Sequence, residues 1–126
     1  MHRCVTLAAM ALVCAWPAAA QAPRNFPATA LRGEIVVAQP PDIRLNGRPA
    51  RLAPGARIRG QNNLLLLSGA LIEQRLLAHY TLDPHGLVLD VWLLTPEEAS
   101  RAPWPTTPEQ AAAWQFDAAA QTWSRR

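Results

Sequence analysis

Two histidines and an aspartate that lie close together are the first residues in this sequence that could carry chemistry. His79, Asp83 and His85 supply imidazole and carboxylate groups, which are typical ligands of zinc. Asp83-Pro84-His85-Gly86, however, has the residue order of a β-turn, and a turn accounts for Asp83 and His85 without a metal. We therefore predict no metal site and no cofactor. A small hydrolase or metal-binding enzyme that uses His79 or His85 is kept as an alternative.

A serine, a histidine and an aspartate also allow a test for a hydrolytic triad. Ser68 lacks the G-x-S-x-G context that exposes a nucleophilic serine at a sharp turn. The hairpin register that we expect pairs Tyr80 with Asp90, which turns the side chains of His79 and Asp90 to opposite faces of the sheet. The sequence thus offers no catalytic set, and we predict that the protein is not an enzyme.

The arginines form the candidate binding site. Between residues 24 and 59 seven arginines face two acids, whereas after residue 59 seven acids face four arginines, and the chain has no lysine. Strand alternation places four of the arginines on one outer surface, where their planar guanidinium groups suit phosphate or carboxylate. A solvated barrel exterior is the alternative explanation. The predicted ligand-binding residues are Arg44, Arg51, Arg57 and Arg59.

Two tight turns predict the β-hairpins that hold these side chains. Asn46-Gly47 is a pair that readily adopts the left-handed dihedral angles of a type I′ turn. In the second turn Asp83 takes the first position and Gly86 the position where a bulge needs positive φ. Apolar alternation and β-branched residues predict strands at 31–38, 42–45, 48–52, 56–59, 75–82 and 87–94. Because its apolar run has no clear period, 61–74 is predicted to be a short irregular or helical connection.

Helix starts follow the last predicted strand. Thr95 and Thr107 are each followed by a proline and an acid, the pattern of an N-cap with proline at the first helical position. Trp114 and Phe116 would lie on different sides of a helix, so the tail 114–123 is expected to leave the helix and run extended over the barrel.

Tryptophan is abundant in the second half of the chain. We expect Trp92 in the core, because it lies on a strand that is apolar on both faces. Trp104, Trp114 and Trp123 are expected to pack as a lid. The alternative is an adaptor that docks onto another protein through this Trp-bearing tail.

The first twenty residues are typical of a secretory signal. A short positive start is followed by an apolar run at residues 5–13, a proline break and Ala18-Ala19-Ala20, so that cleavage near Ala20 would leave Gln21 first. The apolar run is too short to span a bilayer, for which roughly 20 residues are needed. We expect a periplasmic protein that does not span the membrane after cleavage.

Both cysteines lie inside this predicted signal. Removal of Cys4 and Cys14 leaves a chain without a thiol, which excludes disulfides and cysteine-bound metals from the mature protein. Attachment of a lipid to Cys14 is disfavoured because Val13 stands where a small residue is wanted.

The segments LRGEIVVA, IRLNGRPARL and YTLDPHGLVLDVWLLT resemble, in strand order and turn placement, the five-stranded OB-like barrel. They are similar to short exported OB-like β-barrel domains of proteobacteria. The resemblance implies an all-β fold, a small five-stranded OB-like barrel with a short helical C-terminal extension. The expected division is a signal peptide at 1–20, a flexible lead-in at 21–30, the barrel at 31–95 and the extension at 96–126.

Fold alone does not carry function, although OB-like barrels elsewhere bind oligonucleotides or sugars. The aromatic residues that stack on bases are not evident among residues 31–59, so we expect no nucleic-acid partner. The expected function is that of a non-catalytic binding or structural module of the cell envelope. Its partner would be an anionic lipid or wall group, or another envelope protein.

Overall fold

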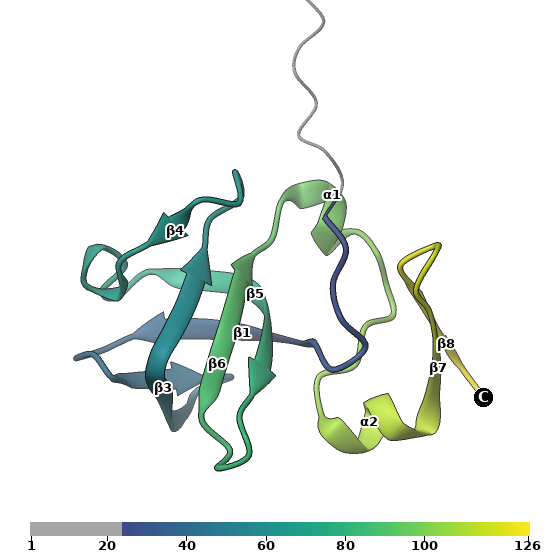
Figure 1. Ribbon diagram of the computed structural model, residues 1–126, viewed down its shortest axis with the longest axis horizontal. Coiled ribbons are helices and arrows are strands. Elements are labelled where there is room, and N and C mark those ends of the chain that lie inside the picture. Colours follow the sequence, from purple (N-terminus) through teal and green to yellow (C-terminus); the bar gives the residue numbers. More distant parts are fainter. Residues whose placement is uncertain (1–23) are drawn as a thin grey trace, which may run out of the picture.

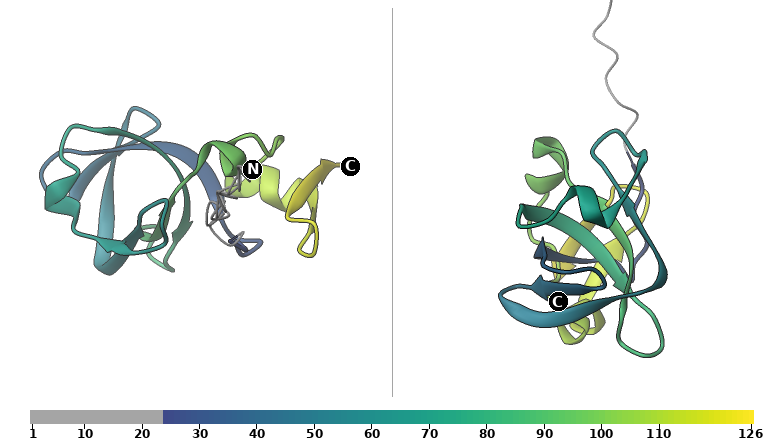
Figure 2. Two further views of the ribbon diagram at one scale, coloured as in Figure 1. Left: turned by 90° about the horizontal axis from the view of Figure 1, so that it is seen from above. Right: turned by 90° about the vertical axis from the view of Figure 1, so that its left-hand side faces the viewer.

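The computed structural model describes residues 24–126. The predicted signal peptide, with Cys4 and Cys14, lies outside the described residues, as does the start of the predicted lead-in. A β-barrel and a C-terminal extension lie side by side (Figures 1 and 2). In the part of the chain that is described, no helix is long and apolar enough to cross a membrane.

Five strands close into the barrel and a sixth lies at its edge. The sheet order is β2-β1-β5-β6-β3-β4, and an additional β2–β3 pairing closes the circle. β3 and β6 run parallel, whereas the other pairs are antiparallel. This topology confirms the predicted all-β, OB-like fold. The strands are β1 (Leu31–Val37), β2 (Asp42–Leu45), β3 (Arg48–Arg59), β4 (Leu65–Leu66), β5 (Arg75–Leu82) and β6 (Val88–Leu93).

Both predicted turns are present. Asn46 and Gly47 have φ angles of 53° and 80°, as a type I′ turn requires. Asp83 donates from its backbone N–H to the carbonyl oxygen of Leu87 at 2.8 Å, and Gly86 has a φ of 80°. The predicted strands 48–52 and 56–59 form one strand, β3. Its register with β6 shifts between Leu52 and Arg57.

The register of the second hairpin differs from our prediction. Tyr80 pairs with Val91 and His79 with Trp92, because a bulge shifts the register between Tyr80 and Leu82. The predicted Tyr80–Asp90 pair is therefore wrong, and His79 and Asp90 point to the same outer face. His79 is buried on that face, because the second core packs over it and leaves it 1% exposed.

The barrel interior is filled by aliphatic side chains from all five strands. Ile35, Val37, Val88 and Val91 are each at most 2% exposed, and Tyr80 is 4% exposed. Alternation of apolar residues along each strand thus points one face inward, as strand geometry predicts.

The extension contains two short helices and a hairpin. Its elements are α1 (Pro96–Ala99), α2 (Pro108–Ala113), β7 (Trp114–Asp117) and β8 (Thr122–Arg125). Thr95 caps α1 as predicted, and its side chain forms a capping box with Glu98. The tail leaves the helix and is extended, as expected, but it does not run over the barrel: its two strands pair with each other in a separate hairpin beside the barrel (Figure 1).

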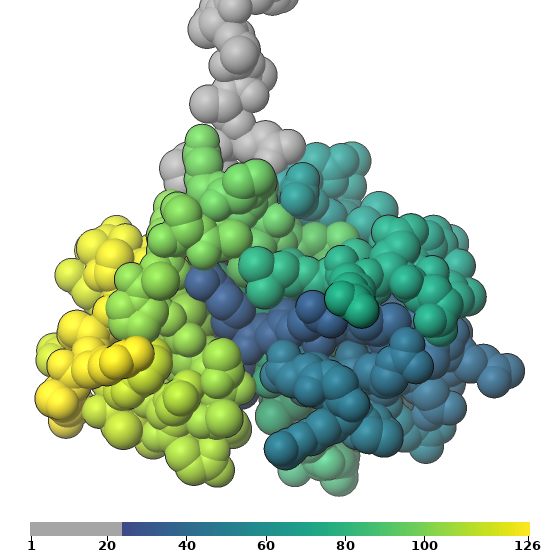
Figure 3. All heavy atoms as spheres, turned by 180° about the vertical axis from the view of Figure 1, so that it is seen from behind, coloured from purple at the N-terminus to yellow at the C-terminus, as the bar shows by residue number. Residues whose placement is uncertain are grey.

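A second apolar core joins the extension to the outside of the barrel. Phe26, Ala30, Leu94, Trp104 and Trp123 are its buried members. In Figure 3 the first described residues run between the barrel and the extension. The described part of the predicted lead-in is thus packed into the protein.

Trp92 does not lie in the barrel interior as we expected. Its side chain is half-buried on the outer face of β6 and packs against the second core, with its ring 5.6 Å from that of Phe26. The strand is covered on both faces, but its outer cover is the extension.

Candidate functional site

Two of the four predicted ligand-binding arginines lie at the end of β3. Arg57 and Arg59 point outward on either side of Ile58, which is 5% exposed and faces the core. Arg57 pairs in register with Asp90 of β6, and Arg59 with Leu65 of β4. Neither guanidinium forms an ion pair with a carboxylate among residues 24–126.

The other two predicted arginines also point outward, but each has an acidic partner. Arg44 Nη2 lies 3.3 Å from Glu73 Oε2, and Arg51 Nε lies 3.2 Å from Asp42 Oδ1. These pairs are about half exposed, and such pairs contribute only about 0–1 kcal/mol. The structure thus leaves Arg57 and Arg59 more available to an external anion than Arg44 and Arg51. That these four residues bind a ligand stays a prediction.

An exposed apolar segment follows β3, and our sequence analysis did not assign it a function. We call residues 64–67 the leucine loop, which includes β4 (Figure 1). Leu64 and Leu65 are each 64% exposed and Leu67 is 81% exposed, and the nearby Ile72 is 47% exposed. Contiguous exposed apolar side chains are uncommon on soluble proteins unless they are used for binding. The run of four consecutive leucines is visible in the sequence, but it does not indicate by itself that the side chains are exposed.

Arginines lie before and after the leucine loop. Arg59 stands opposite Leu65 in the β3–β4 pair. After the loop the chain enters β5 at Arg75, and Val36 of β1 pairs in register with both Arg75 and Arg44 of β2. The acids nearby are Glu73, which pairs with Arg44, and Asp90, which is bound by Thr81. The surroundings of the loop therefore carry a net positive charge.

His79, the candidate of the enzyme alternative, is buried between the barrel and the extension. The residue is 1% exposed, and its ring stacks on Trp104 with centroids 4.1 Å apart and lies nearly perpendicular to the ring of Phe26. Arg32 Nε donates to its Nε2 at 3.3 Å. Burial, and then the charges of Arg32, Arg24 and Arg101, lower the pKa of His79 to about 3. The imidazole is neutral and closed off from solvent.

His85, the other histidine of that alternative, lies far from such an environment. It is exposed in the β5–β6 turn, where its backbone N–H donates to Asp83 Oδ1 at 2.8 Å. Within residues 24–126 there is no group of three histidine, cysteine or acidic residues placed to hold a metal ion.

The burial of His79 predicts a loss of stability in mild acid. The unfolded chain binds a proton near pH 6.5, whereas the folded protein resists it down to about pH 3, so the unfolded state binds more protons in this range. The free energy of unfolding should fall by about 1.4 kcal/mol per pH unit below pH 6.5. We expect a loss of about 2 kcal/mol between pH 7 and pH 5, measured by urea denaturation.

His79→Phe should remove most of this pH dependence, because phenylalanine cannot be protonated. His85→Gln is the matched control and should retain the slope of the parent protein. An equal slope in His79→Phe and in the parent would show that His79 is not held neutral by the fold.

The fold and its surface define a small OB-like barrel with outward arginines beside an exposed leucine loop. In comparisons with known proteins, no protein-family model, curated protein or solved structure matches this chain.

Proposed function

We propose that this protein is a non-catalytic binding module of the cell envelope that attaches to an anionic phospholipid surface through the leucine loop and the arginines beside it. The exposure of three leucines next to Arg57 and Arg59, which have no carboxylate partner among the described residues, carries the proposal. Leucine side chains favour the acyl region of a bilayer, and guanidinium groups pair with lipid phosphate.

The expected energies are sufficient for reversible attachment. Transfer of one exposed leucine into an apolar phase contributes about 1.5–3 kcal/mol, and each basic residue near an anionic membrane about 1 kcal/mol. A few such contacts together exceed the roughly 4 kcal/mol that corresponds to a millimolar dissociation constant. The predicted export signal would bring the protein to membranes that face the periplasm.

The two alternative functions have less support in the geometry. Trp104 and Trp123 are 5% and 6% exposed, so an adaptor would have to dock through other residues of the tail. An enzyme would have to use the exposed His85, and within residues 24–126 no three histidine, cysteine or acidic residues are grouped to hold a metal ion there. Both alternatives stay predictions.

Vesicle binding tests the proposed function. The chain starting at Gln21 should co-sediment with vesicles that contain phosphatidylglycerol, and less with phosphatidylcholine vesicles. The double variant Leu65→Ser with Leu67→Ser should bind at least about tenfold more weakly, because two apolar contacts are lost. The double variant Arg57→Ala with Arg59→Ala should also bind more weakly, and the binding of the parent should weaken with added salt.

Two matched variants serve as controls for this experiment. Leu82→Ser replaces an exposed leucine outside the loop, and Arg48→Ala replaces an exposed arginine at the Asn46-Gly47 turn. Both should bind vesicles like the parent protein. Salt-independent binding, or unchanged binding after Arg57 and Arg59 are replaced, would overturn the proposal.

A further inference from the structure

α2 lies against the barrel without filling the space between them. Ala111 packs against the barrel core, but no residue of α2 is buried. Two hollows remain beside the first turns of α2, and Pro108 lines both. In Figure 3 the β2–β3 hairpin and the segment that leads into α2 face each other. The barrel and the extension thus leave a space of the size that small-molecule sites have, which is about 300–1,000 Å³.

The first hollow has a volume of about 350 Å³ and a mostly apolar lining. Leu31 and Leu82 line it from the barrel, and Ala111 and Ala112 line it from α2. Leu82 is 39% exposed, so part of the lining is in contact with solvent. Because alanine side chains are short, they leave room that larger side chains would occupy. This volume holds roughly ten methylene groups, each about the size of a water molecule.

The second hollow has a volume of about 490 Å³ and carries polar groups. Arg48 lines it from β3 and Glu109 from α2; both are exposed, and neither forms an ion pair within residues 24–126. Tyr80 also lines it and is 4% exposed. The Tyr80 hydroxyl has no hydrogen-bond partner in the described chain, yet it is not among the atoms closed off from solvent. It is therefore left accessible at this hollow.

The two hollows adjoin and differ in character. Pro108 lines both, and Leu31 of the first pairs in register with Tyr80 of the second. We call the combined space, between α2 and these barrel residues, the α2 cleft. One end of the α2 cleft is apolar, and the other offers a cation, an anion and a phenol hydroxyl. Apolar walls with a few polar groups are typical of ligand sites.

We propose that the α2 cleft binds an amphiphile with one acyl chain and a zwitterionic head, as in lysophosphatidylethanolamine. The acyl chain occupies the apolar hollow. In the second hollow Arg48 pairs with the phosphate, Glu109 pairs with the ammonium group, and the Tyr80 hydroxyl donates to a head-group oxygen. Because Arg48 and Glu109 have opposite charges, a head of a single charge would be attracted by one and repelled by the other. This site is separate from the leucine loop and goes beyond the attachment proposed above.

NMR titration with decanoyl-lysophosphatidylethanolamine, below its micelle concentration, tests this proposal. Tyr80 is the only tyrosine in the sequence, so a ring-labelled tyrosine reports on the cleft. We expect a saturable shift of its signal, and binding about tenfold tighter than that of the octanoyl homologue, because two more methylene groups are buried. Decanoate and decylamine, which each carry one charge, should bind about threefold or more weakly. Tighter binding of either would overturn the zwitterionic assignment, and an unshifted Tyr80 signal would overturn the site.

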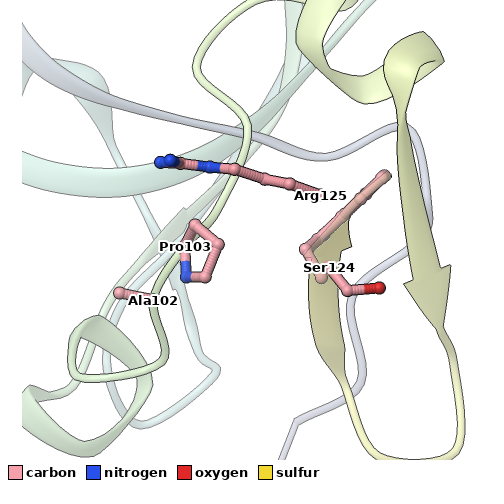
Figure 4. A pocket seen from close by; sticks show the side chains of 5 residues that line it. Ala102, Pro103, Ser124 and Arg125 are labelled. Atoms are coloured by element: carbon pink, nitrogen blue, oxygen red, sulfur yellow. The ribbon is translucent and has the colours of Figure 1, made fainter.

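Variants of α2 connect that binding to the apolar hollow. Ala112→Phe fills the hollow from an exposed position, so it should weaken binding about tenfold or more while thermal unfolding stays close to that of the parent. Ala113→Phe is the matched control, since Ala113 is exposed on the same helix and does not line the hollow. Ser124→Ala is a second control, in the open hollow beside Ala102 and Pro103 (Figure 4). Both controls should bind like the parent. Unchanged affinity in Ala112→Phe would contradict the site.

Two further variants separate this site from the leucine loop. Arg48→Ala should weaken binding of the amphiphile about threefold or more and leave vesicle binding unchanged. Leu65→Ser with Leu67→Ser should do the reverse. Failure of vesicle binding would thus leave the α2 cleft standing, and the converse also holds. If the loop variant lost the amphiphile while Ala112→Phe retained it, the amphiphile would bind at the leucine loop and the proposal would be wrong.

Discussion

Replacement of Glu98 with alanine is expected to lower the free energy of unfolding by about 3–5 kcal/mol, because it leaves a buried arginine without its counterion. The side chains of Glu98 and Arg24 are 8% and 10% exposed, and Arg24 Nε donates to Glu98 Oε2 at 2.9 Å. Glu98 Oε1 also accepts a hydrogen bond of 2.9 Å from the backbone N–H of Thr95. One carboxylate therefore caps α1 and holds the N-terminal segment on the barrel.

The pH dependence of this interaction has a definite sign. Burial opposes ionisation of Glu98, but the hydrogen bond from Arg24, those involving Thr95 and the charge of Arg24 outweigh it, so the pKa of Glu98 lies below its usual value of 4.5. The stabilisation is present above pH 4.5 and is lost as the pH falls through the lowered pKa. Below pH 4.5 this loss adds to that from His79, which continues down to about pH 3, so the interval from pH 7 to pH 5 reports on His79 alone.

Urea denaturation at pH 7 provides the measurement, and Glu97→Ala is the control. Glu97 is exposed on the same helix turn, so its replacement should change the free energy of unfolding by less than about 0.5 kcal/mol. Arg24→Ala should destabilise the protein strongly as well, and the double variant should cost less than the sum of the two single variants. Equal stabilities of Glu97→Ala and Glu98→Ala would contradict the buried pair.

Local sequence chemistry predicted most of the barrel. Asn46 and Gly86 adopt positive φ angles, and Thr95 caps a helix. Few other residue types suit these positions, so the sequence alone indicates the turns and the helix start. The bulge after Tyr80 did not follow, because it depends on how β5 and β6 meet in three dimensions. Because the bulge adds one residue to one strand of the pair, Asp90 lies on the same face of the sheet as His79 and not on the opposite face, as we predicted.

The candidate site was only partly accessible from the sequence. Strand alternation correctly placed Arg57 and Arg59 outside, but the partners of Arg44 and Arg51 depend on contacts between strands and loops. The apolar run at 64–67 carries no periodicity, so its exposure could not be predicted. Apolar side chains are usually buried, and a cluster of exposed ones is expected where a surface has a function.

The second core was the part of the fold least visible in the sequence. It brings Phe26 together with Trp104 and Trp123, which no local pattern relates. The sequence around Thr95 indicates a helix start, but nothing in it indicates that Glu98 binds Arg24. Packing between the N-terminal segment and the C-terminal extension therefore makes the extension part of the folded domain.

Trp104→Ala is expected to destabilise the protein by about 3–5 kcal/mol, since Trp104 lies at the centre of this second core. It is 5% exposed, stacks on His79, contacts Phe116 and Trp123 edge-on, and donates from Nε1 to the carbonyl oxygen of Ala30 at 3.0 Å. Thermal and urea unfolding measure the loss.

Trp114→Ala is the matched control for that variant. Trp114 is only half-buried at the start of β7, so the expected cost is clearly smaller. Amide hydrogen exchange should rise first in the β7–β8 hairpin of Trp104→Ala, because removal of the central ring detaches the extension before the barrel opens. If Trp104→Ala retained the parent's stability, the tryptophans would not hold the extension on the barrel. The adaptor alternative would then account for them better than a packed lid.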